Sequence, residues 1–337
     1  METGEKEAGK RCAFSVTSFF CGCGGLDLGF RGGFTYHGVD YPRTDFNLQM
    51  AYDFDERHVE TYRRNVGTEV RKLDLSDFDV GEVPSARILI GGFPCQDFST
   101  CGPRRGLASQ RGRLYQAMIR FADAYDPEII VGENVPGLEN IDGGRILEKI
   151  REDVSHAGNR GGYGVEVWKL FAPDYGVPQN RTRLIIVGVR KDLLRFGFPE
   201  APVKTLTPEN YHTTRWAIED LEEVVDESVP NQSQYFKASR ARRGNGQGDE
   251  TSPADLPSYT IRANAKSRVQ FHYRLDRRLT VRECARIQTF PDSFVFPHSA
   301  TTNIMEIGNA VPPILGNLVA RSIQKFMRKI DDARSDS

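Results

Sequence analysis

Short apolar runs alternate with helix-spaced apolar positions over the first two-thirds of the chain. The β-rich runs span residues 14–19, 88–90, 129–132 and 184–189. Between the second and third runs, apolar residues recur at helical spacing and predict a helix that packs on a core. These residues are Leu114, Met118, Phe121 and Tyr125. Strands that alternate with helices favour an α/β fold in which helices cover a parallel sheet.

A different pattern begins after Arg190. Residues 193–255 mix Pro, Gly, Asn and charged residues, and the stretch 237–282 carries eleven Lys or Arg against four acidic residues. Such a stretch, placed after the main α/β region, predicts a module that reads a substrate. The last predicted helix, 312–329, returns to the core. Its apolar residues lie at positions 314, 315, 318, 319, 323 and 326.

Composition sets the broad class of protein. With 337 residues, 39% hydrophobic and 27% charged, the chain is typical of a globular protein with one large and one smaller domain. Its longest apolar stretches are too short to span a bilayer and its first residues are polar, so we expect a cytoplasmic protein with no membrane partner. A net charge of −1 means that any nucleic-acid-binding surface must be a local patch.

The six cysteines show no Cys-x-x-Cys spacing and no nearby pair of histidines. We therefore expect no zinc or other metal, and no disulfides in a reducing compartment. The pair Cys21 and Cys23 is better explained by the glycine loop that surrounds it.

That glycine loop, residues 20–25, directly follows the first predicted strand. Glycines at a strand-to-helix turn let the backbone approach a nucleotide-like ligand, although such loops serve NAD, flavin and S-adenosylmethionine alike. Asp53 lies where an acid at the end of the second strand would hold ribose hydroxyls. Asp74 is placed to accept a hydrogen bond from an adenine amino group. Taken singly, each is as well explained as a surface carboxylate.

A cysteine opens the loop after the second predicted strand. Cys95 follows Phe93-Pro94 at the carboxyl end of the run 88–90, where open α/β sheets bind ligands. An isolated cysteine is more often a buried structural residue. Glu133 follows the next strand, and a carboxylate that emerges there would lie near the cysteine in a doubly wound sheet.

Three long polar side chains precede the last of these strands. Gln179, Arg181 and Arg183 alternate along the chain and therefore share one face. They suggest an anionic or carbonyl-rich ligand, and a structural salt bridge is the alternative.

Together these motifs resemble the DNA cytosine-5 methyltransferases. The matching blocks are Phe20-Cys21-Gly22-Cys23-Gly24-Gly25, Pro94-Cys95-Gln96, Glu133-Asn134-Val135 and Gln179-Asn180-Arg181-Thr182-Arg183, followed by residues 278–292 and 307–313. The resemblance covers about residues 13–192 and 256–328. Where relatives often carry an Asp two residues before the first motif's Phe, this chain has Ser18.

The resemblance implies a fold and a domain order. The fold is the Rossmann-like class I S-adenosylmethionine-dependent methyltransferase fold with a small target-recognition domain. Residues 13–192 would form the catalytic and cofactor-binding domain, and residues 193–257 the target-recognition domain. Residues 258–330 would hold the two late motifs and the helix that returns to the catalytic domain.

It also implies a reaction. Cytosine is a poor carbon nucleophile, and a thiolate that adds to carbon 6 activates carbon 5 by creating an enamine. Cys95 would be that thiolate. Glu133, protonated or sharing a proton, would hold ring nitrogen 3 and the exocyclic amine. Arg183 would contact the base's carbonyl oxygen, and Arg181 would order the site. The target base must be flipped out of the duplex.

The remaining site residues follow from the same resemblance. The cofactor S-adenosylmethionine would be bound by Phe20, Gly22, Cys23, Gly24, Asp53, Phe54, Asp74, Leu75, Pro94, Leu114, Asn309 and Ala310. DNA and the flipped base would be bound by Gln96, Ser99, Arg104, Arg105, Asn134 and Gln179.

The expected partner is double-stranded DNA, bound by a monomer in the nucleoid, with a cognate restriction endonuclease as a further partner. The alternatives are a tRNA cytosine-5 methyltransferase and a catalytically silent DNA-binding homologue. The hallmark Cys-Phe-Thr block of the tRNA enzymes is not apparent, and mere binding would not need Cys95, Glu133 and Arg183. A metal or NAD enzyme would have no use for Cys95 together with Glu133.

Overall fold

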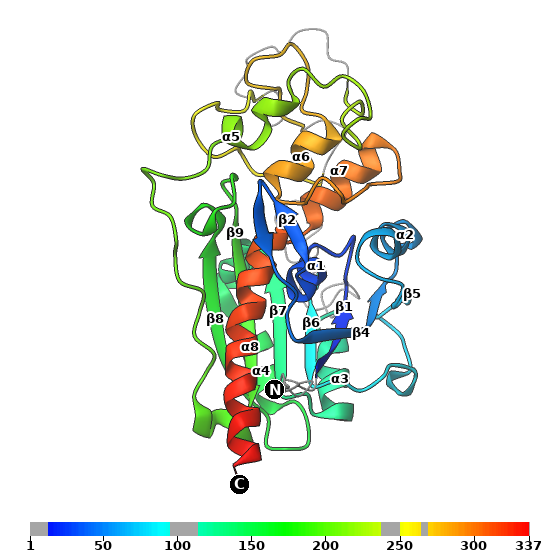
Figure 1. Ribbon diagram of the computed structural model, residues 1–337. Helices are drawn as coiled ribbons and strands as arrows, with labels where there is room; N and C mark the ends of the chain where they lie inside the picture. Colours follow the sequence, from blue (N-terminus) through cyan, green and yellow to red (C-terminus); the bar gives the residue numbers. More distant parts are fainter. Residues whose placement is uncertain (1–12, 95–113, 237–249, 264–268, 337) are drawn as a thin grey trace, which may run out of the picture.

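A seven-stranded sheet with the order β5-β4-β1-β6-β7-β9-β8 forms the centre of the structure (Figure 1). The structure is a computed structural model that describes residues 13–94, 114–236, 250–263 and 269–336. The strands of the sheet are β1 (Phe14–Phe19), β4 (Phe46–Asp53), β5 (Val70–Lys72), β6 (Ile88–Gly91), β7 (Ile129–Asn134), β8 (Tyr163–Phe171) and β9 (Thr182–Arg190). The helices are α1 (Gly25–Arg31), α2 (Glu56–Asn65), α3 (Gln116–Tyr125), α4 (Arg145–His156), α5 (Thr214–Ile218), α6 (Val281–Ile287), α7 (Ala300–Asn309) and α8 (Pro313–Ser335).

The four strands predicted from apolar runs are confirmed as β1, β6, β7 and β9, and the predicted helices are confirmed as α3 and α8. The expectation of a parallel sheet needs one correction. Strand β9 runs antiparallel to both of its neighbours, β7 and β8. Only ten residues link β8 to β9, which is too short for a crossover helix and therefore forces the two strands to run in opposite directions.

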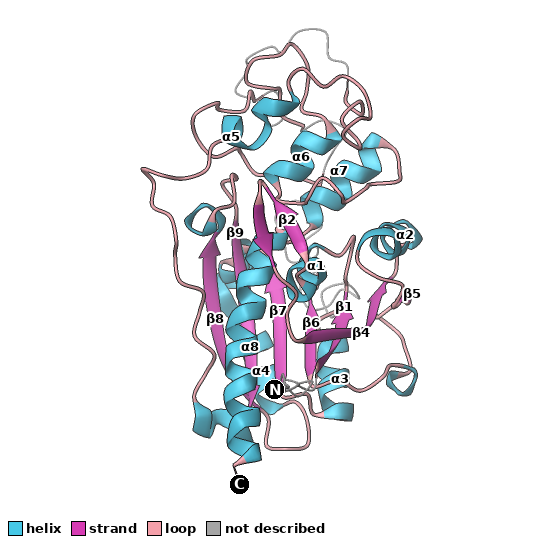
Figure 2. Ribbon diagram, in the orientation of Figure 1, coloured by secondary structure: helices cyan, strands magenta, loops and turns pink. Residues whose placement is uncertain are grey.

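Helices cover both faces of the sheet (Figure 2). Helices α1 and α8 pack on one face, where Phe30 and Leu315 join a core with Ile90 and Val131 of the strands. Helices α3 and α4 pack on the other face, where Phe121 joins a second core. The arrangement confirms the α/β architecture with a mostly parallel sheet. None of the helices among the described residues has the length and apolarity that a bilayer span requires.

A short antiparallel hairpin between α1 and β4 was not predicted. Strands β2 (Phe34–Tyr36) and β3 (Val39–Tyr41) pair through a two-residue turn at His37-Gly38. Both turn residues have positive φ, 45° and 74°, as expected for a type I′ turn that matches the strand twist. Phe34 and Tyr36 are buried while Thr35 is exposed, so the hairpin presents one apolar face to the interior.

The chain then forms an upper region that contains α5, α6 and α7 (Figure 1). Its buried residues, such as Ile218 and Cys284, share one hydrophobic core with Tyr36 of the hairpin and Tyr62 of α2. The predicted target-recognition domain, residues 193–257, supplies part of this region, and residues after 257, which include α6 and α7, supply the rest. Its boundary at residue 257 therefore stays a prediction, because the packing continues across it.

Candidate active site

The carboxyl ends of β1, β4, β6 and β7 meet at the edge of the sheet that faces α6 and α7 (Figure 1). Residues that follow these strands are brought together although they are far apart in the sequence. The glycine loop follows β1, Asp53 ends β4, Pro94 follows β6, and Glu133 is the second-to-last residue of β7. This topology brings the predicted site motifs to one edge of the sheet.

The glycine loop has strained backbone angles at Phe20 and open space beside Gly22. Phe20, the half-buried residue after β1, has φ 56°, which is rare for a bulky side chain and marks local strain. Gly22 has φ 53°, and a Cβ at this position would meet no atom within 4 Å, so there is open space beside the loop. At Gly24 there is no room for a side chain, because a Cβ there would lie 2.6 Å from Val66, which follows α2. The loop thus leaves room for a ligand at Gly22.

Asp53 ties the end of β4 to this loop. Its Oδ2 accepts a hydrogen bond from the Gly22 N–H at 2.9 Å, and its Oδ1 accepts one from the Asp55 N–H at 3.0 Å. The Nδ1 of His58 lies 3.0 Å from the same Oδ1. The carboxylate is 5% exposed. A carboxylate has about four acceptor positions, and these three contacts leave one on Oδ2, beside Gly22.

Three further predicted cofactor residues lie in the segments that follow β4 and β5. Phe54 follows Asp53 and is 65% exposed, a high value for a large aromatic side chain. Asp74 is exposed, and hydrogen bonds from Ser76 lower the pKa of its carboxyl. Leu75 lies in the core at 2% exposure. An exposed ring and an exposed carboxylate are the groups that an aromatic base with an amino group would need.

Other predicted cofactor residues lie around the loop in different environments. Cys23 is buried, and its thiol lies 3.7 Å from the Glu306 carbonyl, so its side chain is directed into the protein. Burial raises the pKa of this thiol well above the usual range. Pro94 and Leu114 are half-buried, and they are the described residues on either side of the segment 95–113. Ser18 is a buried residue of β1, and it pairs with Ala51 of β4 and Ile90 of β6.

Glu133 and Arg183 form a buried ion pair. Arg183 Nε lies 2.5 Å from Glu133 Oε1, and both side chains are about one-tenth exposed. The pairing of β7 with β9 produces this contact, because Glu133 is opposite Ile185 in the register. Burial lowers the pKa of Arg183, and the charge of Glu133 counteracts that shift. A Cβ at Gly92 would lie 3.1 Å from Glu133 Oε2, so the carboxylate also borders the loop that leads to Cys95.

Arg181 orders the loop after α7. Its guanidinium donates hydrogen bonds to the Gly308 and Ala310 carbonyls, each at 2.8 Å, and to the Ile261 carbonyl at 3.2 Å. Gln288 adds a bond to the Ala310 carbonyl at 2.6 Å. Ala310 is half-buried and lies close to the start of α1, 3.0 Å from where a Cβ at Gly25 would be, and Asn309 is exposed. Arg181 is 2% exposed, and burial lowers its pKa.

Two residues expected to contact DNA are buried instead. Asn134 is 2% exposed, and its Nδ2 donates to the Phe93 carbonyl at 3.0 Å. Gln179 is fully buried, and its Oε1 accepts from the Ile261 N–H at 3.0 Å while its Nε2 donates to Gln288. Both amides are used within the protein. In this structure they position the loops of the site, which differs from the expected contact with DNA.

Several predicted residues lie outside the described residues. These are Cys95, Gln96, Ser99, Arg104 and Arg105. Their roles stay predictions. Within the described ranges, no group of three or more His, Cys, Asp or Glu residues has an arrangement that would hold a metal ion.

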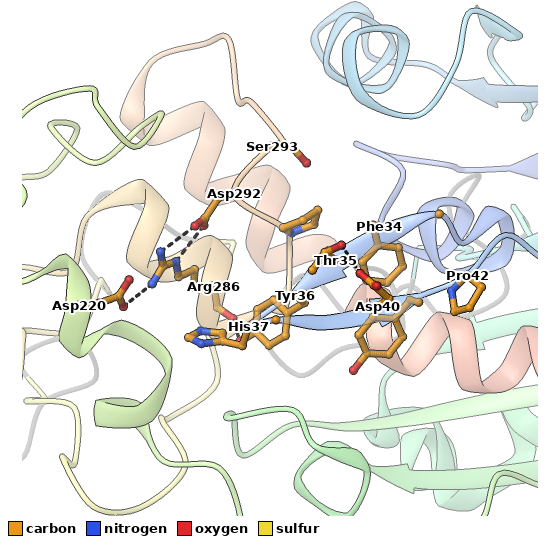
Figure 3. A pocket seen from close by; sticks show the side chains of 14 residues that line it. Phe34, Thr35, Tyr36, His37, Asp40, Pro42, Asp220, Arg286, Asp292 and Ser293 are labelled. Atoms are coloured by element: carbon orange, nitrogen blue, oxygen red, sulfur yellow. Dashed lines mark hydrogen bonds and ion pairs between the residues drawn. The ribbon is translucent and has the colours of Figure 1, made fainter.

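A cavity of about 860 Å³ lies elsewhere, between the β2–β3 hairpin and the upper region (Figure 3). Its lining includes Asp40, Asp220 and Asp292, and its one arginine, Arg286, is already paired with the last two of these carboxylates. The excess of negative charge does not suit a phosphate backbone. The cavity is therefore lined by other residues than the site at the strand ends, and its negative charge does not suit DNA.

The residues that hold the site residues in place through hydrogen bonds were not predicted from the sequence. His58 and Thr61 of α2 contact Asp53 and Glu306, and Gln288 connects Gln179 to Ala310. A single His or Gln within a helical pattern carries no signal of its own. Only the three-dimensional contact with a motif residue identifies it.

Comparison with known proteins identifies the family. Residues 14–325 match the family model of the C-5 cytosine-specific DNA methylases. The Type II methyltransferase M.BspRI of Lysinibacillus sphaericus is 33% identical over 93% of this chain and 82% of its own length. The Type II methyltransferase M.FnuDI of Fusobacterium nucleatum is 30% identical over 93% of this chain and 94% of its own length.

Solved structures show the same fold. The methyltransferase EhMeth of Entamoeba histolytica superimposes with a TM-score of 0.71 at 17% identity, covering 94% of this chain and 99% of that one. The Dnmt2 methyltransferase of S. pombe gives a TM-score of 0.65 at 18% identity, with the same coverage. The sheet order, the convergent motifs and the family match over nearly the whole chain agree, and the chain belongs to the C-5 cytosine-specific DNA methylases, the DNA cytosine-5 methyltransferases.

Proposed function

We propose that this methyltransferase uses Cys95 to form a covalent bond to carbon 6 of a flipped cytosine in duplex DNA, and that it methylates carbon 5 with S-adenosylmethionine. The buried pair of Glu133 and Arg183 carries the proposal. It provides an acid and a cation next to the loop that begins at Pro94. A polar ring with a ring nitrogen, an amine and a carbonyl oxygen matches these two groups.

Each residue has a defined part in the reaction. The Cys95 thiolate adds to carbon 6, and the electrons of the carbon 5–carbon 6 double bond become available at carbon 5. Glu133 offsets the negative charge on the ring by holding a proton at nitrogen 3, and Arg183 holds the carbonyl oxygen. After methylation a base removes the carbon 5 proton, the double bond re-forms and the thiolate leaves.

The described residues fit S-adenosylmethionine, which supplies the methyl group from its sulfonium. Open space at Gly22 admits the ligand. The remaining acceptor position of Asp53 binds a ribose hydroxyl, the exposed ring of Phe54 packs on the adenine, and Asp74 accepts from its amino group. Phe20, the backbone of Cys23 and Gly24, Leu75, Pro94, Leu114, Asn309 and Ala310 complete the enclosure.

The rest of the chain serves the substrate. We assign Arg181, Asn134 and Gln179 to positioning, because their polar groups bind loop backbone and Gln288. Gln96, Ser99, Arg104 and Arg105 contact the DNA, and residues 193–257 read the target sequence. The relatives are named Type II methyltransferases, which supports a role beside a cognate restriction endonuclease.

Methylation mapping tests this function. The purified protein is incubated with duplex DNA and S-adenosylmethionine, and the product is sequenced after bisulfite treatment. We expect 5-methylcytosine at one recurrent sequence, and none with the Cys95→Ser variant. Methylation of tRNA but not of duplex DNA would contradict the proposal, and so would full activity of the variant.

A further inference from the structure

A buried cluster links Asp53 of the proposed cofactor site to three residues that belong to none of the motifs. It joins Asp53, at the end of β4, to His58 of α2, and Thr61 of α2 to Glu306 of α7. All four residues are less than a tenth exposed. His58 and Thr61 are three residues apart and share one face of α2. One helix face thus connects the ribose acid with the helix that ends in Asn309.

The contacts fix which oxygen of Asp53 is available. Oδ1 accepts from the Asp55 N–H and lies 3.0 Å from His58 Nδ1, so both of its acceptor positions are used. Oδ2 accepts from the Gly22 N–H and keeps one position. The imidazole must donate from Nδ1, because an ionised carboxylate can only accept. Without that donor the carboxylate keeps only the two hydrogen bonds from the Gly22 and Asp55 N–H groups, and its orientation is less restricted.

The charges around His58 favour this arrangement. Burial alone lowers the pKa of His58, but the hydrogen bond to Asp53 and the charges of Asp53, Glu306 and Asp55 outweigh it and raise the pKa. The other ring nitrogen, Nε2, is buried and has no hydrogen-bond partner among the described residues. Glu306 is held by the Thr61 hydroxyl, 2.9 Å and 3.1 Å from its two oxygens. A protonated imidazole beside the Asp53 carboxylate is therefore electrostatically favoured.

We propose that His58 is a positioning residue for the cofactor: its Nδ1–H holds the Asp53 carboxylate in the orientation that presents Oδ2 to a ribose hydroxyl. The inference rests on the proposed function, because it takes Asp53 as the ribose acid. His58 itself touches no substrate. Its effect is expected in cofactor affinity, and the methyl-transfer step at saturating cofactor should change little.

Two substitutions of similar polarity separate this role from simple packing. In His58→Asn the amide nitrogen reaches the place of Nδ1 and restores the bond to Asp53. In His58→Gln the amide nitrogen lies one bond further out, at the place of Nε2, and the bond is not restored. His298→Ala is the matched control, since His298 Nε2 lies 3.0 Å from the Arg57 carbonyl of the same helix and does not contact Asp53.

The experiment measures the dissociation constant of S-adenosylmethionine by titration calorimetry, and the turnover rate at saturating cofactor. For His58→Gln and His58→Ala we expect about tenfold weaker binding, the usual effect of losing a hydrogen bond to a charged group, and turnover within about twofold of the wild type. His58→Asn and His298→Ala should bind within about twofold of the wild type.

The outcomes distinguish this inference from the proposed function. If Asp53→Ala loses binding while His58→Gln binds normally, the positioning role is wrong and the cofactor site stands. If folded His58→Asn binds as weakly as His58→Gln, the Nδ1 contact is not the cause and the inference is overturned. If the wild-type protein itself binds no S-adenosylmethionine, the proposed function fails first. Thermal unfolding of each variant confirms that the compared proteins are folded.

Discussion

At the scale of single residues, charge is buried where the reaction is proposed to occur. Glu133, Arg181 and Arg183 are each less than a tenth exposed, although such side chains are almost never fully buried unless paired. Arg183 is paired with Glu133, and Arg181 is bonded to carbonyl groups. Removing one partner of a buried pair leaves the other without compensation. These residues should therefore affect both catalysis and stability.

Glu133→Gln is expected to lower the turnover rate by about 10²–10⁴-fold, because a positioned acid is lost. It should also lower the free energy of unfolding by about 3–5 kcal/mol, since Arg183 stays buried without a counter-charge. Methyl-transfer kinetics and denaturant unfolding measure the two effects.

The double variant Glu133→Gln with Arg183→Gln should regain much of the stability and none of the activity. Glu139→Gln, which breaks the exposed pair with Lys169, is the control and should change stability by less than about 1 kcal/mol. A double variant that is less stable than the single one would contradict the ion-pair interpretation.

Glu306 gives a prediction about pH. Burial raises the pKa of its carboxyl to about 7. The ionised form is disfavoured in the folded state, so the contribution to stability is present at pH 4 and is lost as the pH rises through 7. Glu306→Gln removes this loss and should be more stable than the wild type by about 3 kcal/mol at pH 8, with little difference at pH 4. Unfolding curves at both pH values check this, and equal stability at pH 8 would count against it.

At the scale of elements, strands with continuous apolar runs were predictable and the polar hairpin was not. The apolar residues of β1, β6, β7 and β9 mark them as buried on both faces. Strands β2 and β3 have three residues each; Phe34 and Tyr36 are buried, and Tyr41 is partly buried against the same core. The turn at His37-Gly38 is a weak version of the Asn-Gly signal. The direction of β9 depends on its link to β8, which an apolar run does not reveal.

The β2–β3 hairpin connects the sheet domain to the upper region through side-chain contacts with α5 and α6. Its Tyr36 hydroxyl donates to the Arg286 carbonyl of α6 at 2.7 Å, and His37 stacks on Trp216 of α5. Tyr36→Phe should lower the free energy of unfolding by about 1 kcal/mol, because one buried hydrogen bond is lost and the ring is kept. Denaturant unfolding measures this. Tyr41→Phe in the neighbouring strand, whose ring stacks on Phe34, is the control and should leave stability unchanged. No loss in Tyr36→Phe would mean that water replaces the bond.

In the site, too, motif residues were predictable from the sequence, whereas residues defined by their contacts were not. Glycine, Pro-Cys and Glu-Asn-Val motifs at strand ends predict where the site forms, and the structure shows Asp53 in contact with the glycine loop through the Gly22 N–H. Asn134 and Gln179 belong to the same motifs, but their burial depends on loops that come from distant parts of the chain. His58 belongs to no motif. Such support residues become visible only when the contacts are known.

At the scale of the whole molecule, the net charge of −1 requires that DNA be met by local positive charge. Arg104 and Arg105, outside the described residues, are our candidates for phosphate contacts. Replacing both by Ala should weaken binding to all duplex sequences alike and reduce the salt slope by roughly 0.9 per lost contact. Binding titrations at several salt concentrations measure the slope. Arg151→Ala on the exposed face of α4 is the control. A change of sequence preference would show instead that these residues read bases.

The proposed covalent bond between Cys95 and cytosine is tested most directly with DNA that contains 5-fluorocytosine at the target site. Fluorine cannot leave carbon 5 as a proton does, so the methylated adduct cannot release the enzyme. Mass spectrometry after incubation with S-adenosylmethionine should show the protein joined to the DNA through Cys95, and no adduct for Cys95→Ser. An adduct at another residue, or an active enzyme that forms no adduct with this DNA, would contradict the account.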